Sequence, residues 1–257
     1  IYAIGFVISV ILIVKLTRTS LADISWRLIS LTLLVSLWLL MEALSFPAPK
    51  EWILIFQRLK YLGVILVAPV LLVTSICFIK KEHCLGAVQR ALIYFIPLLS
   101  LISVFTNRIP YRFIIQPQVS FLGKVPIYSY TKDTGFVINM AYSYLLIMIA
   151  CYLLFIRALQ SPRIYRRQSM FVFFGCSASF VINLLFVTQN YVLIPIDTTP
   201  LMILATLVVF YWGVFHLPKS MIVPYARDMV IENIKDLILV VDNSRCIIDV
   251  NPVALEL

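Results

Sequence analysis

Residues 195–227 read PIDTTPLMILATLVVFYWGVFHLPKSMIVPYAR and separate two kinds of sequence. A helix from Ile194 to Phe215 would be roughly 33 Å long at a rise of ~1.5 Å per residue, which is enough to cross the hydrocarbon core of a bilayer. After Arg227 charged residues become frequent, and short strand-like runs follow. The stretch therefore predicts the last membrane span and its junction with a soluble region, which favours a receptor over a transporter or channel.

The overall composition is that of an integral membrane protein. Of the 257 residues, 62% are hydrophobic and 13% are charged, whereas soluble domains contain about 45–50% apolar residues. The net charge of +9 could suggest nucleic acid, but the Lys and Arg residues stand mainly between apolar segments, where they set membrane topology. We therefore expect the lipid bilayer, and no nucleic acid, as a partner.

Apolar segments predict a bundle of seven transmembrane helices over residues 1–217. They cover about 1–14, 24–46, 52–79, 87–105, 136–159, 169–188 and 194–215. Prolines and charged residues between them would end each helix. The longer connection, 107–134, mixes apolar, basic and proline residues. It predicts an ordered hairpin or lid on the outer face, with a connector that only plugs the bundle as the alternative.

The distribution of basic residues orients the predicted spans. If the amino terminus lies outside, the inner loops carry Lys15, Arg18, Arg27, Lys80, Lys81, Arg90, Arg157, Arg163, Arg166 and Arg167. The outer side carries fewer, namely Lys50, Arg58, Lys60, Arg108, Arg112, Lys124 and Lys132. Because basic residues favour the cytoplasmic side, an odd number of spans then places the carboxyl-terminal tail in the cytoplasm.

A few charged residues lie within the predicted spans, where each costs about 2.5–3.5 kcal/mol at the helix centre unless it faces a partner or a cavity. Glu42 can reach Arg58 or Lys60 across a short turn, and Asp197 can cap the helix that follows it. One hypothesis is an outward-facing pocket for a small polar or charged ligand; the alternative is purely structural pairs and caps. The predicted pocket comprises Glu42, Arg58, Lys60 and Asp197, with Gln57, Tyr61 and Tyr142 or Tyr144 nearby.

The sequence contains no motif that predicts a catalytic or metal site. It has no nucleophile elbow, Walker loop or HExxH pattern, and its cysteines do not form a CxxC pair. His83 and His216 both stand at predicted inner membrane boundaries, where a structural role is the simpler interpretation. We therefore expect no catalytic residue, metal or cofactor in this chain, and a membrane enzyme is the least favoured function.

The tail predicts a signalling linker and the start of a soluble domain. In residues 218–236, Ala226, Val230 and Ile234 recur on one helical face, which suits packing against a second copy in a homodimer. Runs at 237–241 and 246–250 around a polar turn predict a β-hairpin. Asn251-Pro252 then has the pattern of a helix start.

The order of these parts resembles two known families. Asp242, the second strand and Asn251-Pro252 resemble the opening of a PAS domain, so residues 237–257 would be a truncated α/β PAS domain. The membrane part resembles the seven-transmembrane sensor region of bacterial histidine kinases. The matching residues are Glu42, Gln57–Pro69 (QRLKYLGVILVAP), Asp197-Thr198-Thr199-Pro200 and Pro224-Tyr225-Ala226-Arg227.

The resemblance implies a sensory input region in a bacterial plasma membrane. Its output would follow a PAS domain and act on a response regulator in a two-component system; a diguanylate cyclase is the alternative output. The chain begins at Ile1 and stops within the PAS-like part, so we expect it to be cut at both ends. The ligand and any PAS cofactor stay open. The residues expected to transmit the signal are Pro200, Pro224, Ala226, Arg227, Val230 and Ile234.

Overall fold

The computed structural model describes residues 1–19, 22–79, 85–108, 110–122, 125–160, 163–188, 197–215, 239–241, 247–250 and 253. The chain divides into two compact units, Ile1–Tyr211 and Trp212–Leu257. Each unit is described by itself.

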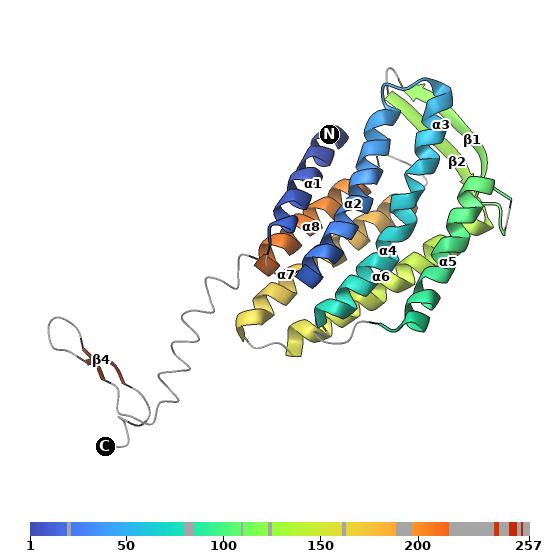
Figure 1. Ribbon diagram of the computed structural model, residues 1–257. Coiled ribbons are helices and arrows are strands. Elements are labelled where there is room, and N and C mark those ends of the chain that lie inside the picture. The colour runs from blue at the N-terminus through green and yellow to red at the C-terminus, as the bar shows by residue number, and fades with distance from the viewer. Residues whose placement is uncertain are drawn as a thin grey trace. The chain divides into compact units, whose positions relative to one another are not determined.

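The first unit is a helix bundle with one β-hairpin (Figure 1). Its helices are α1 (Tyr2–Thr17), α2 (Ala22–Ser45), α3 (Lys50–Leu59), α4 (Tyr61–Ile79), α5 (Ala87–Thr106), α6 (Thr134–Gln160), α7 (Arg163–Thr188) and α8 (Thr199–Phe215). Each predicted span contains a helix, and the third contains two. Lys60 separates α3 from α4, although its backbone angles are those of an α-helix.

Several helices have the length and composition of membrane spans. The segments Ser25–Ser45, Lys50–Phe78, Ala87–Thr106 and Thr134–Gln160 are long and apolar enough to cross a bilayer, and Tyr2–Thr17 and Thr199–Trp212 are shorter apolar helices. Large apolar side chains such as Ile4 on α1 and Leu92 and Phe95 on α5 are exposed. Lipid would cover such surfaces, which are too extensive for a monomer in water. That all seven predicted spans cross the membrane stays a prediction.

Small residues bring the helices of the bundle close together. Ser36 on α2 donates a hydrogen bond of 2.6 Å to Ser9 on α1. On α4, a Cβ atom added at Gly63 would lie 2.6 Å from the carbonyl oxygen of Leu34 on α2. Glycine and serine at such crossings allow the close backbone approach that drives helix association in lipid.

The contact between α2 and α4 gives a first testable prediction. Gly63→Ala should lower the free energy of unfolding by about 1–3 kcal/mol, because the added methyl group must push a backbone carbonyl away. Denaturant titration in mixed micelles measures the loss. Gly86→Ala is the matched control, since a Cβ atom there meets nothing within 4 Å. Equal stability of the two variants would contradict the close packing of α2 on α4.

The predicted hairpin in the long connection is confirmed. Strands β1 (Ile114–Leu122) and β2 (Val125–Lys132) pair antiparallel, with a register irregularity between Ile115 and Gln118. Asn107 ends α5 in the left-handed conformation, at φ 49°. Its Oδ1 accepts hydrogen bonds from the backbone N–H groups of Phe113 and Ile114, and its Nδ2 donates to the carbonyl of Ile114. One side chain therefore joins the end of α5 to the start of the hairpin.

Phe113, just before β1, packs the hairpin against the bundle together with Ile114. The Phe113 ring makes edge contacts with the rings of Tyr61 on α4, at a centroid distance of 5.2 Å, and of Phe136 on α6, at 5.7 Å. Phe113 and Tyr61 are buried together with Ile65 in one apolar cluster. The hairpin is thus an ordered part of the first unit, as Figure 1 shows beside α3 and α5.

The second unit contains the predicted carboxyl-terminal strand pair. Strand β3 (Leu239–Val241) pairs antiparallel with β4 (Ile247–Val250). The linker at 218–236, with Pro224, Ala226, Arg227, Val230 and Ile234, lies outside the described residues, as do Asp242, Asn251 and Pro252. The strand pair is therefore confirmed, and its assignment to a PAS domain stays a prediction.

Candidate functional site

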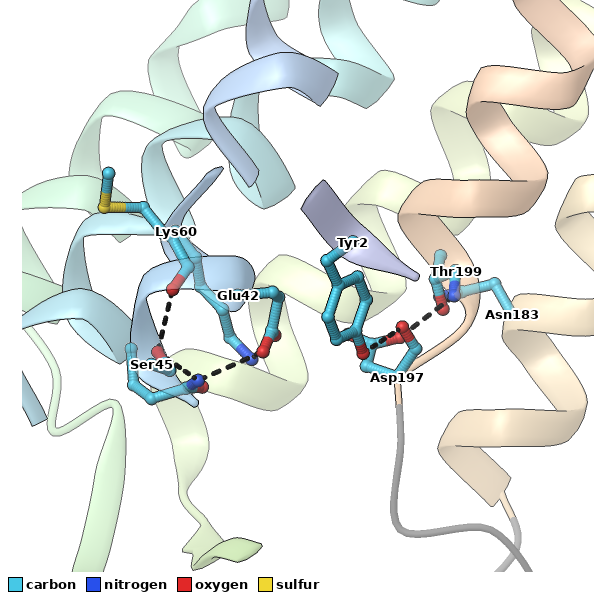
Figure 2. Close-up of polar contacts among 9 residues, drawn as sticks. Tyr2, Glu42, Ser45, Lys60, Asn183, Asp197 and Thr199 are labelled. Atoms are coloured by element: carbon cyan, nitrogen blue, oxygen red, sulfur yellow. Dashed lines mark hydrogen bonds and ion pairs between the residues drawn. The ribbon is translucent and has the colours of Figure 1, made fainter. Parts of the chain in front are cut away.

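A buried ion pair joins α2 to the junction of α3 and α4. Glu42 lies in the last turn of α2, and Lys60 Nζ lies 2.7 Å from its Oε1 (Figure 2); the two side chains are only 8% and 11% exposed. Gln57 Nε2 donates to Glu42 Oε2 at 3.2 Å and to Ser45 Oγ at 3.3 Å. Arg58 is exposed and forms no ion pair with a described residue. The predicted pair is therefore formed with Lys60 and not with Arg58.

A second set of polar groups lies at the start of α8. The backbone N–H of Thr199 donates to Asp197 Oδ1 at 3.1 Å, so Asp197 satisfies an N–H group at the start of α8 as predicted, although Thr198 occupies the N-cap position itself. The carbonyl of Asp197 accepts a hydrogen bond of 2.7 Å from the hydroxyl of Tyr2 on α1. Thr199 Oγ1 in turn accepts from Asn183 Nδ2 on α7, at 3.2 Å. The beginning of α8 is thus held from two sides.

The two sets are neighbours. Figure 2 shows the Tyr2 ring between Glu42 and Asp197. Asp197 is close enough to Lys60 and to Glu42 for both charges to act on it. We call Tyr2, Glu42, Gln57, Lys60 and Asp197 the polar cluster. It contains three of the four predicted ligand-sensing residues, and that it binds a ligand stays a prediction.

A cavity of about 140 Å³ lies in the bundle, lined by α2, α4, α6, α7 and α8. Tyr61 and Tyr144, which the pocket hypothesis named as neighbours, belong to its lining, whereas Glu42, Arg58, Lys60 and Asp197 do not. The walls are mostly apolar, with some hydroxyl and amide side chains. Its residues are Leu31, Trp38, Tyr61, Val64, Val67, Ala68, Leu71, Phe136, Asn139, Met140, Ser143, Tyr144, Ile147, Cys176, Ser179, Phe180, Asn183, Thr199, Ile203, Thr206, Leu207 and Phe210.

Tyr142 lies away from the cavity, and three residues of the site were not predicted from the sequence. The Tyr142 hydroxyl donates to the backbone of α5, at the carbonyl of Ile93, and does not line the cavity. Sequence reasoning missed Tyr2, Trp38 and Asn139. An asparagine in an apolar span was a usable signal, because a polar amide in lipid normally faces a partner or a cavity. Tyr2 and Trp38 gave no comparable signal.

The helices and the buried ion pair together define a class of protein. Apolar helices with exposed apolar faces, together with a charge pair buried between them, are those of a multi-pass helical membrane protein. The family model for the N-terminal 7TM region of histidine kinase, HisKA_7TM, matches residues 1–224, and the chain belongs to this family. No curated protein matches the chain. The resemblance seen in the sequence is therefore confirmed for the membrane part.

Proposed function

We propose that the chain is the sensory input region of a bacterial sensor histidine kinase in a two-component system. It would respond to an extracellular or membrane signal and pass it through α8 to a PAS domain. The family match over residues 1–224 is the observation that carries this proposal. The antiparallel strand pair after the bundle supports the PAS assignment, because a PAS domain opens with two such strands in the resemblance described above.

The polar cluster supplies a means by which a signal could reach α8. Tyr2 of α1 is hydrogen-bonded to Asp197, two residues before α8 begins, and lies beside the Glu42–Lys60 pair at the end of α2 and the α3–α4 junction (Figure 2). A ligand that binds here can shift an equilibrium only by the difference in its affinity for two arrangements of these groups. A polar or charged ligand that competes for Lys60 or Glu42 would loosen this connection. Movement of α8 is the proposed consequence.

The proposed topology follows from the basic residues. With the amino terminus outside the bacterial inner membrane, an odd number of crossings brings the tail to the cytoplasm, where ATP and a response regulator are present. Homodimerisation through the linker face of Ala226, Val230 and Ile234 would let the two copies change their packing together. A small-molecule ligand on the outer side is the proposed stimulus.

The linker gives the prediction that tests this function. In membrane vesicles that contain the full-length gene product, Val230→Asp should change the rate of ATP-dependent autophosphorylation at least threefold without changing the amount of inserted protein. An aspartate in an apolar dimer face must disturb its packing. Lys235→Asp is the matched control, since position 235 lies on the helical face opposite the apolar stripe. Absence of phosphorylation on histidine, or unchanged rates in Val230→Asp, would overturn the proposal.

A further inference from the structure

We propose that the cavity between α2, α4, α6, α7 and α8 binds a small neutral molecule with a ring-sized apolar body and one hydroxyl group, a class of which phenol is the simplest member. This proposal adds a site to the proposed function, and only its signalling consequence rests on that function. Three properties of the cavity carry it: volume, lack of charge and unpartnered polar atoms.

Volume sets the size of the ligand. The cavity measures about 140 Å³, and an engineered apolar protein cavity of about 150 Å³ stays dry and binds benzene. A molecule with one aromatic ring therefore fits, whereas a lipid or a peptide does not. Packed helix bundles contain few voids of this size, because each void loses dispersion contacts along its walls.

The walls set the polarity of the ligand. Aliphatic and aromatic side chains such as Leu31, Val64 and Phe210 form most of the lining, and no residue in it carries a formal charge at neutral pH. Burying an ionised group there would cost many kcal/mol without a counterion. The ligand class is therefore neutral, in contrast to the charged or polar ligand expected at the polar cluster.

Two buried polar atoms set the position of the hydroxyl group. Trp38 on α2 and Asn139 on α6 both line the cavity and are only 4% and 6% exposed. Within the described part of the chain, neither Trp38 Nε1 nor Asn139 Oδ1 has a hydrogen-bond partner. The indole N–H is a donor, and the amide oxygen is an acceptor. A ligand hydroxyl that reaches the first accepts from it, and one that reaches the second donates to it.

An unpartnered polar group in the interior is expensive, at about 1–3 kcal/mol for each. A ligand hydroxyl that completes either hydrogen bond removes part of this cost, which adds to the gain from covering the apolar walls. Purely apolar molecules of the same size gain only the free energy of covering the apolar walls. The site therefore prefers phenol over benzene.

A ligand in the cavity would contact α8 and the residues that hold the β-hairpin. Thr199, Ile203 and Phe210 bring successive turns of α8 to the lining. Tyr61 and Phe136 line the cavity and also contact Phe113 at the base of the β-hairpin. A ligand there touches both the helix proposed to carry the signal and the groups that hold the hairpin.

Phenol titration of the chain in lipid nanodiscs, followed by NMR of ¹⁵N-labelled tryptophan indoles, tests the proposal. The chain has four tryptophans; Trp26, Trp52 and Trp212 are 65%, 53% and 50% exposed, whereas Trp38 is buried. Trp38→Phe assigns the Trp38 resonance. We expect this resonance alone to shift saturably, with benzene at least fivefold weaker and Asn139→Leu about tenfold weaker for phenol.

Two cavity-filling variants separate binding from partition into the bilayer. Ala68→Phe on α4 and Ser143→Leu on α6 add volume from two different helices, and each should abolish the saturable shift. A linear shift of all four resonances, a shift that persists in both filled variants, or no shift of Trp38 would overturn the proposal. Each of these outcomes leaves autophosphorylation and its dependence on Val230 untouched, so failure here is distinguishable from failure of the proposed function.

Discussion

Lys60→Met is expected to lower the free energy of unfolding by about 3–5 kcal/mol, because removal of one partner leaves the other charge buried without a counterion. The Glu42 side chain is buried, and its Oε1 lies 2.7 Å from Lys60 Nζ. After the substitution, Gln57 Nε2 is the one donor among the described residues that would still reach this carboxylate. Methionine keeps the length and apolar stem of the lysine, so the lost charge is the main change. The measurement is reversible unfolding in SDS-containing mixed micelles, followed by far-UV circular dichroism.

The double variant Glu42→Gln/Lys60→Met separates charge burial from packing. With both charges removed, much of the lost stability should return, since neutral replacement of a buried pair is often close to neutral in energy. Arg58→Met is the matched control: it removes a cation nearby that is exposed, and it should change stability by less than about 1 kcal/mol. If Lys60→Met and Arg58→Met have the same effect, the pair does not stabilise the bundle.

The same variants bear on signalling. If the pair is only structural, Glu42→Gln should affect stability alone, whereas a sensing role also changes the response to stimulus. Autophosphorylation measured at matched amounts of inserted protein distinguishes the two, because destabilised protein lowers the amount and not the regulation.

The helix positions were predictable because the hydrophobicity of many consecutive residues adds up to identify a membrane span. Most of the apolar runs are bounded by a charge or a proline, and lipid tolerates neither an exposed charge nor an unpaired backbone group. The contact of Glu42 with Lys60 was accessible for a related reason, since the connection 46–49 is too short to separate the ends of α2 and α3. The pattern of apolar residues did not predict the break between α3 and α4 at Lys60.

The cavity could not be predicted from the sequence. The cavity forms because side chains from five helices leave space between them. None of these residues is unusual for the apolar segment in which it stands. Ala68 and Ser143 are small residues that would also suit close helix contact. Only the packed bundle shows that space is left beside them, and that the polar atoms of Trp38 and Asn139 are left without partners.

The hairpin was predicted in part: its presence was expected, but the contacts that hold it were not. Tyr and Ile residues with several prolines indicated an ordered extended segment, but not how it is held. That information lies in Asn107, whose short amide side chain can both adopt a positive φ and bond to the backbone a few residues on. A sequence pattern alone does not distinguish such an asparagine from one in an ordinary loop.

Asn107→Ala is expected to destabilise the hairpin by about 3–6 kcal/mol. Three hydrogen bonds are lost, each worth about 0.5–1.5 kcal/mol net, and alanine in the left-handed conformation adds about 1–2 kcal/mol. The lost bonds are those to the N–H groups of Phe113 and Ile114 and to the carbonyl of Ile114. Hydrogen exchange of the amides in 113–122 and 125–132 should become at least about 100-fold faster, since it reports local opening of this segment.

Two further substitutions at position 107 separate the loss of the side-chain hydrogen bonds from the cost of the left-handed backbone conformation. Asn107→Gly keeps the positive φ at no steric cost and loses only the side-chain bonds, so it should be more stable than the alanine variant. Asn107→Asp keeps the acceptor for Phe113 and Ile114 and should be the mildest of the three. Because Phe113 packs on Tyr61 and Phe136, both at the cavity, opening of the hairpin should also weaken phenol binding. Faster exchange in the hairpin with unchanged phenol affinity would show that the hairpin and the cavity act independently.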